Sequence, residues 1–446
     1  MNYRQALDYL LRFADFERSG RFSSRPDVLP VESLLRHLGD PQRGRLTVHV
    51  AGSKGKGSTS AIIDSILRQC GLRPDGPVGL YTSPHLHSFR ERIRVDGVPV
   101  SHACFTACAD ALEGSIEEVR REYPERELVT FDLLTAMAFL AFREARATAQ
   151  VIETGLGGRV DSTNALGDKD VCVITPISFE HQSILGHTLP EIAAEKAGII
   201  RAGSSVVMAL QQPEAAAVIR DAAALLGAPL IEVGESCRIE RVACDADGQE
   251  FSLKTPLRRY DLRLPLLGLH QLENAATAVL AVEALRERGV EASAEQVARG
   301  VAGVRWPGRL EVMSRRPLLI VDGAHNGESA RRLRETLTDD LGYRKATFVI
   351  GVSSDKNLGA MASELRALAG TVFATSSVHP RAMPATKVAE ALRSEGFSVT
   401  ETSSVAEAVD AALAGAKEDE VVCVLGSLFV AAEARAHVLG IEEDAG

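Results

Sequence analysis

Three glycines and a lysine stand close together in the segment His49–Ser60, which reads HVAGSKGKGSTS. An apolar run, Leu46–Ala51, leads into it, and a helix-compatible stretch, Ser58–Cys70, follows. A glycine-rich turn between a strand and a helix points backbone N–H groups at an anion, and the helix N-terminus adds positive potential. We therefore predict a phosphate-binding loop in which Lys56 contacts the terminal phosphates of a nucleotide and a hydroxyl of Ser58 or Thr59 faces Mg²⁺.

This loop departs from the common phosphate-binding pattern G-x-x-x-x-G-K-[ST]. Val50 stands where the first glycine of that pattern would be, and Gly57 directly follows the lysine. The other two glycines are Gly52 and Gly55. Because the glycines are offset relative to the lysine, the sequence predicts a nucleotide-binding loop of a variant kind.

A second group of chemically useful side chains lies in Val151–Asn164, VIETGLGGRVDSTN. Glu153 ends an apolar run, and parallel sheets bind ligands at the carboxyl ends of their strands. Near a phosphate loop, a carboxylate in that place would hold Mg²⁺ that bridges the phosphates of ATP. Asp161 and Asn164 add polar groups to the same turn. The alternative interpretation is a glycine-rich loop in which Glu153 is a solvated carboxylate.

His181 and Lys196 are two further candidates. His181 follows another strand end and would complete a metal shell as a neutral imidazole, although a structural histidine is the alternative. Lys196 lies on a predicted helix, Thr188–Ile200, among alanines. A partly desolvated lysine has a lowered pKa and reacts with CO₂, and the resulting carbamate is an oxygen ligand for a second Mg²⁺. An ordinary surface lysine is the alternative for Lys196.

These residues must be positioned by strands that end at one edge of a sheet. Apolar, β-branched runs alternate with helical stretches along most of the chain, which predicts an α/β fold with a mostly parallel sheet. The region Cys237–Leu264 alternates apolar and charged residues and predicts a small antiparallel patch. The expected strands are Leu46–Ala51, Val78–Tyr81, Gln150–Glu153, Val171–Pro176, Ser205–Ala209, Leu318–Val321, Ala346–Ile350, Thr371–Ala374 and Val421–Leu425. Besides the stretches after the loops, helices are expected over Asn326–Leu337, Leu272–Arg288 and Ala294–Gly300.

The chain of 446 residues is too long for one hydrophobic core, so two or three domains are expected. The step Pro307-Gly308 is typical of a linker. We therefore expect an ATP-binding domain over residues 1–303, a linker over 304–309 and a smaller Rossmann-like α/β domain over 310–446.

Composition excludes several classes of function. The formal net charge of −10 argues against a general binder of nucleic acid or of anionic membranes. Apolar runs fall short of the roughly 20 residues of a membrane span, and the N-terminus lacks a signal-peptide cleavage region, so we expect a cytoplasmic enzyme. The seven cysteines are scattered. Cys104 and Cys108 lie four residues apart, but no second pair is close in sequence, and we predict free thiols.

Several motifs together resemble the folylpolyglutamate synthase/dihydrofolate synthase family, within the Mur ligase superfamily. They occur in the family's order over most of the chain, and their joint occurrence is far more specific than any single match. Besides the variant phosphate loop, they are YTSPHL (81–86), FRERI (89–93), ETGLGGRVDSTN (153–164), EKAGII (195–200), HQLENAA (270–276), PGRLE (307–311), DGAHN (322–326) and GSL (426–428).

This resemblance implies an ATP-dependent amide ligase that forms ADP. A carboxylate of dihydropteroate or of a folate would be phosphorylated to an acyl phosphate, which the amino group of L-glutamate then attacks. The small-molecule substrates would be ATP, L-glutamate and a pteroate or folate. Two Mg²⁺ sites are expected, and a monovalent cation is a further candidate. The resemblance implies no nucleic-acid or membrane partner, and a monomer would suffice.

The resemblance also implies roles for individual residues. Lys56 would hold ATP phosphates, whereas Ser83, Glu153 and His181 would position Mg²⁺, with Lys196 as a carbamylated lysine at a second metal. Asn274, Arg309 and Asp322 match nucleotide-contacting positions, Arg309 reaching the γ-phosphate. The residues implied for the other substrates are Phe131 and Asp161 for the pterin and His325 and Ser427 for the incoming glutamate.

Four positions differ from the usual family pattern. Ser53-Lys54 replaces a Thr-Asn pair and adds a positive charge, Glu180 replaces an aspartate, and Asp132 replaces a glutamate. The two carboxylate changes alter the reach of the side chain by a methylene, about 1 Å or more. They bear on metal geometry and pterin fit more than on ATP chemistry.

Other functions remain as alternatives. The first is another Mur-type amino-acid ligase with a different carboxylate acceptor. The second is a nucleotide-dependent switch or motor. Two observations argue against it: the sequence has many candidate metal ligands, and it lacks the N-K-x-D motif that recognises guanine. A non-catalytic descendant is the third, although the residues expected to handle phosphate and metal are all present.

Overall fold

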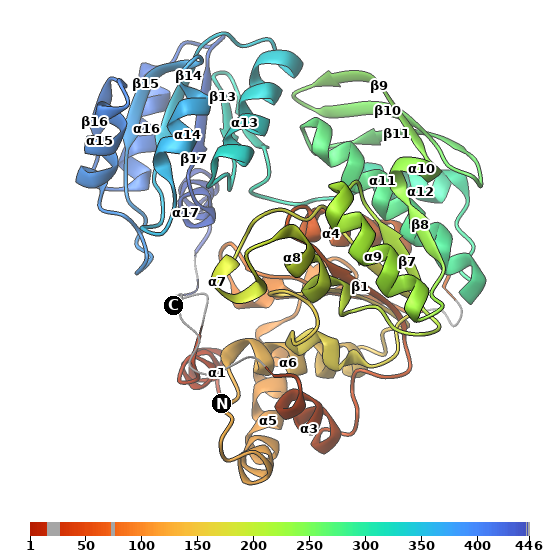
Figure 1. Ribbon diagram of the computed structural model, residues 1–446. Helices are drawn as coiled ribbons and strands as arrows, with labels where there is room; N and C mark the ends of the chain where they lie inside the picture. The colour runs from red at the N-terminus through yellow and green to blue at the C-terminus, as the bar shows by residue number, and fades with distance from the viewer. Residues whose placement is uncertain (16–26, 73–75, 443, 445–446) are drawn as a thin grey trace.

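Two parallel-rich sheets, each with helices packed against it, form the body of the protein (Figure 1). The computed structural model describes residues 1–15, 27–72, 76–442 and 444. The α/β fold predicted from the alternating pattern is confirmed. Each of the nine predicted strands is present, with ends within two residues of those expected.

The larger sheet has the strand order β4-β3-β2-β5-β1-β6-β7-β8. The strands from β2 to β8 pair in parallel, whereas β3 and β4 are antiparallel additions at one edge. Five of the six residues of β1 are buried, as expected for a central strand covered on both faces. The strands are β1 (Leu46–Ala51), β2 (Val78–Tyr81), β3 (Ile93–Val95), β4 (Val98–Pro99), β5 (Ala149–Glu153), β6 (Val171–Ile174), β7 (Ser205–Met208) and β8 (Leu230–Glu232).

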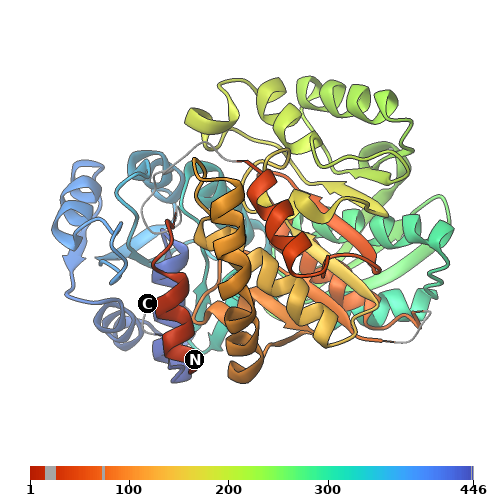
Figure 2. The same ribbon diagram turned by 90° about the horizontal axis from the view of Figure 1, so that it is seen from below.

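Helices cover this sheet on both sides, and α1 packs beside α5 below it (Figure 2). The short helices η1 and η2 follow β2 and β5. The helices of this part are α1 (Tyr3–Leu10), α3 (Leu29–His37), α4 (Lys56–Leu67), η1 (Phe89–Arg92), α5 (His102–Glu122), α6 (Thr130–Glu144), η2 (Ser162–Leu166), α7 (Gln182–Leu185), α8 (Leu189–Ala197), α9 (Pro213–Leu225), α10 (Val233–Ser236), α11 (Leu269–Ala284), η3 (Leu285–Arg288) and α12 (Ala294–Ala302).

The predicted antiparallel patch is a three-stranded sheet of β9 (Arg238–Asp245), β10 (Gly248–Lys254) and β11 (Arg259–Leu264). Its buried face joins the core of the larger sheet through Phe251, Leu253 and Leu262. Arg241 of β9 also forms an ion pair with the buried Asp340 beyond the linker, 2.5 Å apart. The patch therefore connects the two α/β units at a second place besides the linker.

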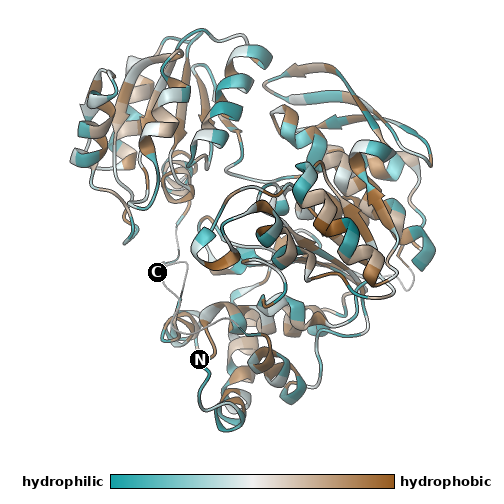
Figure 3. Cartoon of the chain, viewed as in Figure 1, coloured by the Kyte–Doolittle hydropathy of each residue, from teal (hydrophilic) through white to brown (hydrophobic). Residues whose placement is uncertain are grey.

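The second sheet has the order β12-β13-β17-β14-β15-β16, parallel except for β12. Its strands are largely brown in Figure 3, and the helices around them mix teal, white and brown segments, which fits a buried sheet under helices that are polar on their exposed faces. The elements are β12 (Glu311–Arg315), β13 (Leu318–Val321), α13 (Gly327–Glu335), η4 (Thr336–Asp340), β14 (Ala346–Ile350), α14 (Leu358–Leu365), β15 (Ala369–Ala374), α15 (Ala385–Ser394), β16 (Val399–Glu401), α16 (Val405–Gly415), β17 (Val421–Leu425) and α17 (Leu428–Leu439).

Candidate active site

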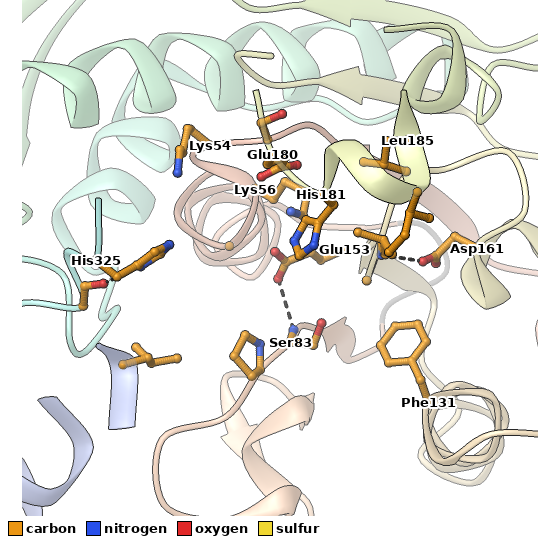
Figure 4. A pocket seen from close by; sticks show the side chains of 18 of the residues that line it. Lys54, Lys56, Ser83, Phe131, Glu153, Asp161, Glu180, His181, Leu185 and His325 are labelled. Atoms are coloured by element: carbon orange, nitrogen blue, oxygen red, sulfur yellow. Dashed lines mark hydrogen bonds between the residues drawn. The ribbon is translucent and has the colours of Figure 1, made fainter. Parts of the chain in front are cut away.

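A cavity of about 850 Å³ lies where loops from both α/β units face each other. The loops at the carboxyl ends of β1, β2, β5 and β6 line it from one side, and those of β13, β14 and β17 from the other. Figure 4 shows Lys56, Ser83, Glu153 and His181 in the middle of this cavity, with Phe131 and Asp161 toward one end and His325 toward the other. Loops that are distant in the sequence thus converge on one space.

The phosphate loop takes its shape from backbone contacts. The N–H groups of Ser53 and Lys54 both donate to the carbonyl of Pro176, at 3.0 Å each. Gly55 is left-handed, with φ +80°, and α4 begins at the next residue, Lys56, two residues before the helical stretch expected from the sequence. The first N–H groups of a helix lack acceptors within it, so those after Gly55 are available to an anion.

Each glycine of the loop allows a close approach. A Cβ on Gly52 would lie 1.9 Å from the hydroxyl of Thr175, and one on Gly55 would lie 2.3 Å from Oδ1 of Asn274. At Gly57 it would lie 2.6 Å from the indole of Trp306 in the linker region. The offset glycines therefore seat the loop against a neighbouring strand end, against α11 and against the linker.

Two hydroxyls at the start of α4 were candidates for Mg²⁺, and they differ in position. Ser58 lines the cavity, but Thr59 is fully buried behind it. The Thr59 Oγ1 atom has no hydrogen-bond partner among the described residues. Ser58 is thus the hydroxyl placed to face a ligand.

Glu153 sits at the end of β5, is buried, and accepts a hydrogen bond from the Ser83 N–H at 3.2 Å (Figure 4). His181 faces the same space and has a left-handed backbone, with φ +45°. Such a conformation costs a non-glycine residue on the order of 1 kcal/mol or more and is found most often at functional sites. Burial lowers the pKa of His181, which keeps its imidazole neutral and able to donate a lone pair.

Lys196 is 1% exposed, so it is not a surface lysine. Its ammonium donates to the Gly52 carbonyl and to Oε1 of Glu180, both at 2.8 Å. Burial lowers the pKa of Lys196 to about 8, with Glu180 opposing the shift and Lys56 adding to it. Lys196 lies behind the phosphate loop, and Glu180 connects it to the cavity.

Phe131 and Asp161 form the end of the cavity near α6. The Asp161 carboxylate accepts from the N–H of Leu156 at 2.8 Å and from the hydroxyl of Thr163 at 2.5 Å. The carboxylate of Asp132 is instead engaged within the protein. It accepts hydrogen bonds from the Val129 N–H at 2.8 Å, at the start of α6, and from the Ser162 hydroxyl. Burial raises the pKa of Asp132 to about 6.

The opposite end carries residues of the linker and the second sheet. Asp322 accepts from the Leu310 and Ala324 N–H groups at 2.7 Å each, while Arg309 lies beside it and opposes the rise in its pKa that burial causes. His325 donates from Nδ1 to the Gly323 carbonyl at 2.9 Å, which leaves Nε2 as an acceptor. Ser427 is the N-cap of α17. These side chains all line the cavity.

The donor set suits a hard cation that is shared with phosphates. Mg²⁺ takes oxygen ligands and keeps several waters, so one or two protein carboxylates and substrate phosphates commonly complete its shell. Glu153 and Ser83 supply such oxygens. Within the described ranges, no cluster of three or more His, Cys, Asp or Glu side chains is arranged to hold an ion by itself. A cation in this cavity would therefore depend on the nucleotide for ligands.

Several lining residues had no role assigned to them from the sequence. Glu180 was noted as a replacement without a role, and the structure pairs it with Lys196. Lys54 lines the cavity, where burial lowers its pKa and the charges of Glu180 and Glu328 raise it. Lys356 and Arg381 also line the second side, and no motif marks either of them. Only the fold brings Lys356 and Arg381 to the site.

Gly158 joins the loop after β5 to helix α8, which gives a testable prediction. A Cβ on Gly158 would lie 2.9 Å from the carbonyl oxygens of Glu195 and Lys196. We expect Gly158→Ala to displace this loop and to lower kcat about 100-fold, because misplacement by about 1 Å costs that much in a preorganised site. The kcat of both proteins is measured from steady-state ADP release. Gly114→Ala on α5, where a Cβ meets nothing within 4 Å, is the control and should leave kcat unchanged.

Comparisons with known proteins match nearly the whole chain. Residues 50–282 match the Mur ligase middle domain and residues 308–428 the Mur ligase glutamate ligase domain. The chain is 36% identical over 419 residues to the dihydrofolate synthase/folylpolyglutamate synthase of Bacillus subtilis, covering 93% of this chain and 95% of that one.

Two solved structures show the same similarity. One is Mycobacterium tuberculosis folylpolyglutamate synthase complexed with ADP and AMPPCP, at 30% identity and a TM-score of 0.87, covering 98% of this chain and 100% of that one. The other is E. coli FolC in complex with DHPP and ADP, at 29% identity and a TM-score of 0.85, covering 99% of this chain and 98% of that one.

None of the helices in the described part of the chain has the length and apolar character that a membrane span requires.

Proposed function

The chain belongs to the folylpolyglutamate synthase/dihydrofolate synthase family of Mur ligases, and from this premise we propose that it joins L-glutamate to dihydropteroate, to a reduced folate or to both. It is an ATP-dependent ligase. The observation that carries the proposal is a cavity in which the phosphate loop lies between an end formed by Phe131 and Asp161 and an opposite end near His325. Three substrates have to meet there for one amide bond to form.

The first chemical step requires the acceptor carboxylate to attack the γ-phosphate of ATP. Both groups are anions, so the site must neutralise the charge that develops during transfer. We assign this task to Lys56 and to the N–H groups at the start of α4, with Arg309 approaching from the linker. ADP then leaves the γ-phosphate on the acceptor as an acyl phosphate.

In the second step, the amino group of glutamate attacks the acyl carbon, and phosphate leaves. We place the glutamate near His325 and Ser427 and the acceptor's pterin near Phe131 and Asp161. Water would hydrolyse the acyl phosphate, and two facing α/β units around one cavity restrict its access. Asn274 and Asp322 are assigned to the nucleotide.

We propose that Mg²⁺ binds with Glu153, Ser83 and His181, and that Lys196, once carbamylated, supports a second ion. The ions supply Lewis-acid stabilisation of the phosphoryl oxygens. We further propose that residues 1–303 and 310–446 act as two domains joined by 304–309. One copy of the chain supplies both walls of the cavity, so a monomer suffices for activity.

A comparison of acceptors tests the proposed function. Purified protein is incubated with ATP, Mg²⁺ and labelled L-glutamate together with dihydropteroate or tetrahydrofolate. We expect labelled product and one ADP per amide with at least one acceptor. If neither acceptor is glutamylated, a different carboxylate is the substrate and the folate assignment is wrong.

The metal assignment leads to a separate prediction at Glu153. Glu153→Gln keeps the shape of the side chain and an acceptor for the Ser83 N–H, but it removes the negative charge. We expect the Mg²⁺ concentration for half-maximal ADP release to rise about tenfold or more, since ligand charge dominates the binding of hard cations. The exposed Glu250→Gln on β10 is the control. An unchanged Mg²⁺ titration would exclude Glu153 as a ligand.

A further inference from the structure

Arg381 is held at the cavity by its backbone. It lies in the connection after β15, where the Ser354 N–H donates to the Arg381 carbonyl at 2.9 Å and the Met383 N–H donates to the Val352 carbonyl at 2.8 Å. The connection is thereby fixed against the carboxyl end of β14. Arg381 consequently shares this edge of the sheet with His325 and Ser427, which follow β13 and β17.

The guanidinium group of Arg381 has hydrogen-bond donors without an acceptor in the described structure. Its Nε atom is buried and makes no hydrogen bond within the described structure, and its centre is 6.0 Å from the ring of Phe429. That ring stacks on His379 with a centroid distance of 3.6 Å and an interplanar angle of 9°. No described carboxylate lies within ion-pair distance of Arg381. The Arg381 side chain lines the cavity wall, so a ligand there would supply acceptors for guanidinium donors that the described residues leave unpaired.

The position of Arg381 relative to Lys356 indicates which part of a ligand it would meet. Lys356 and Arg381 both line this wall of the cavity. Lys356 is paired with Asp355 at 2.8 Å, and the charge of Arg381 also lowers the pKa of Asp355, so Arg381 is a second cation near this pair. The amine and α-carboxylate of an amino acid share one carbon, whereas a second carboxylate lies about 4 Å or more further along the side chain.

We propose that Arg381 binds the side-chain carboxylate of the incoming amino acid and thereby selects L-glutamate over L-glutamine. This inference rests on the proposed function. Arginine has only donors, and a carboxylate accepts two of them side by side. The amide of glutamine offers one acceptor and turns a second donor toward the guanidinium. The two amino acids have nearly the same size, so the charge and hydrogen-bond pattern must carry the discrimination.

Amino-acid selectivity tests the inference with the full-length enzyme. KM and kcat are measured for L-glutamate and L-glutamine, at saturating ATP and acceptor, in the wild type, Arg381→Gln and Arg381→Lys. We expect Arg381→Gln to raise the KM for glutamate about 30-fold or more and to lower the glutamate-to-glutamine ratio of kcat/KM at least tenfold, with the KM for ATP unchanged. Arg381→Lys should retain part of the selectivity, because it keeps the positive charge but cannot donate two parallel hydrogen bonds to one carboxylate.

The control is Arg366→Ala, which removes an exposed arginine paired with Glu395 in the same domain. An unchanged selectivity ratio in both Arg381 variants would overturn the inference, including the case in which both amino acids lose activity equally. Arg381→Lys decides the matter if Arg381→Gln does not fold. Failure of the proposed function is a distinct result, because the wild type itself would then form no amide with glutamate.

Discussion

Replacing Lys56 by alanine is expected to abolish ATP-dependent ligation while the protein stays folded. Lys56 is the first residue of α4, directly after the left-handed Gly55, and it projects into the centre of the cavity (Figure 4). A cation that meets developing phosphoryl charge in a site shielded from water contributes far more than a surface charge. We expect kcat/KM for ATP to fall about 1,000-fold or more, measured by ADP release and by labelled product.

Folding should not suffer from this substitution. The positive charge of Lys56 repels the buried Lys196 and attracts the carboxylate of Glu180, so its removal changes two interactions in opposite directions. The melting temperature of Lys56→Ala should therefore stay close to that of the wild type. Near-normal turnover in the folded variant would reject the role of Lys56.

Two other lysines serve as comparisons for Lys56. Lys254→Ala changes an exposed residue of β10 and should behave as wild type. Lys54→Ala removes the additional charge of this loop, which lies on the cavity near Glu180 and Glu328. We expect a smaller loss with Lys54→Ala than with Lys56→Ala, because acidic side chains already share the charge of Lys54.

The fold was predictable because the central strands of both sheets are almost entirely buried. A strand such as β17 is apolar along its whole length, and β1 is apolar except at Thr47 and His49, so both stand out from the sequence without any tertiary information. The strands β3, β4, β8, β12 and β16, which lie at or next to the edges of the sheets, were not predicted. They have two to five residues each, and pairing with a neighbour rather than their own composition fixes them.

The site was predictable where motifs mark it and not elsewhere. Glu153 and Asp322 stand at the ends of apolar strands, where the topology of a parallel sheet places ligands. The start of α4 at Lys56 depends on the left-handed Gly55, which an offset glycine pattern does not specify. The ion pair of Glu180 with Lys196 joins a loop to a helix, and Arg381 reaches the cavity only through the hydrogen bonds of its turn.

The hydrogen bonds of Lys196 bear on whether this lysine becomes carbamylated. An ammonium at this place is satisfied by Glu180 and by the Gly52 carbonyl. Its pKa of about 8 means that a substantial fraction of the amine is neutral near pH 8, and this fraction increases as the pH rises. The neutral amine can attack CO₂, which forms an N–C bond and releases one proton to give a carbamate. A carbamate would replace a cation with an anion behind the phosphate loop, beside the proposed metal site.

Lys196→Ala is accordingly expected to be inactive, with kcat reduced about 1,000-fold or more, because it removes the proposed metal-supporting oxygen altogether. A short-chain carboxylate such as acetate should restore part of the activity by occupying the space of the carbamate. Lys196→Arg keeps a positive charge, cannot form the carbamate and fills the space, so it should be inactive and resist rescue. Acetate should not stimulate the wild type.

Dependence on CO₂ provides an independent measurement on the unmodified chain. Wild-type enzyme in CO₂-depleted buffer should lose activity and regain it on addition of bicarbonate. At equal concentrations of dissolved CO₂, recovery should be faster at pH 8.5 than at pH 7 because more of the amine is neutral. Full activity of unrescued Lys196→Ala would remove the carbamate from the mechanism. Activity of Lys196→Arg equal to that of the wild type would instead show that only the positive charge, held by Glu180 and Gly52, is required.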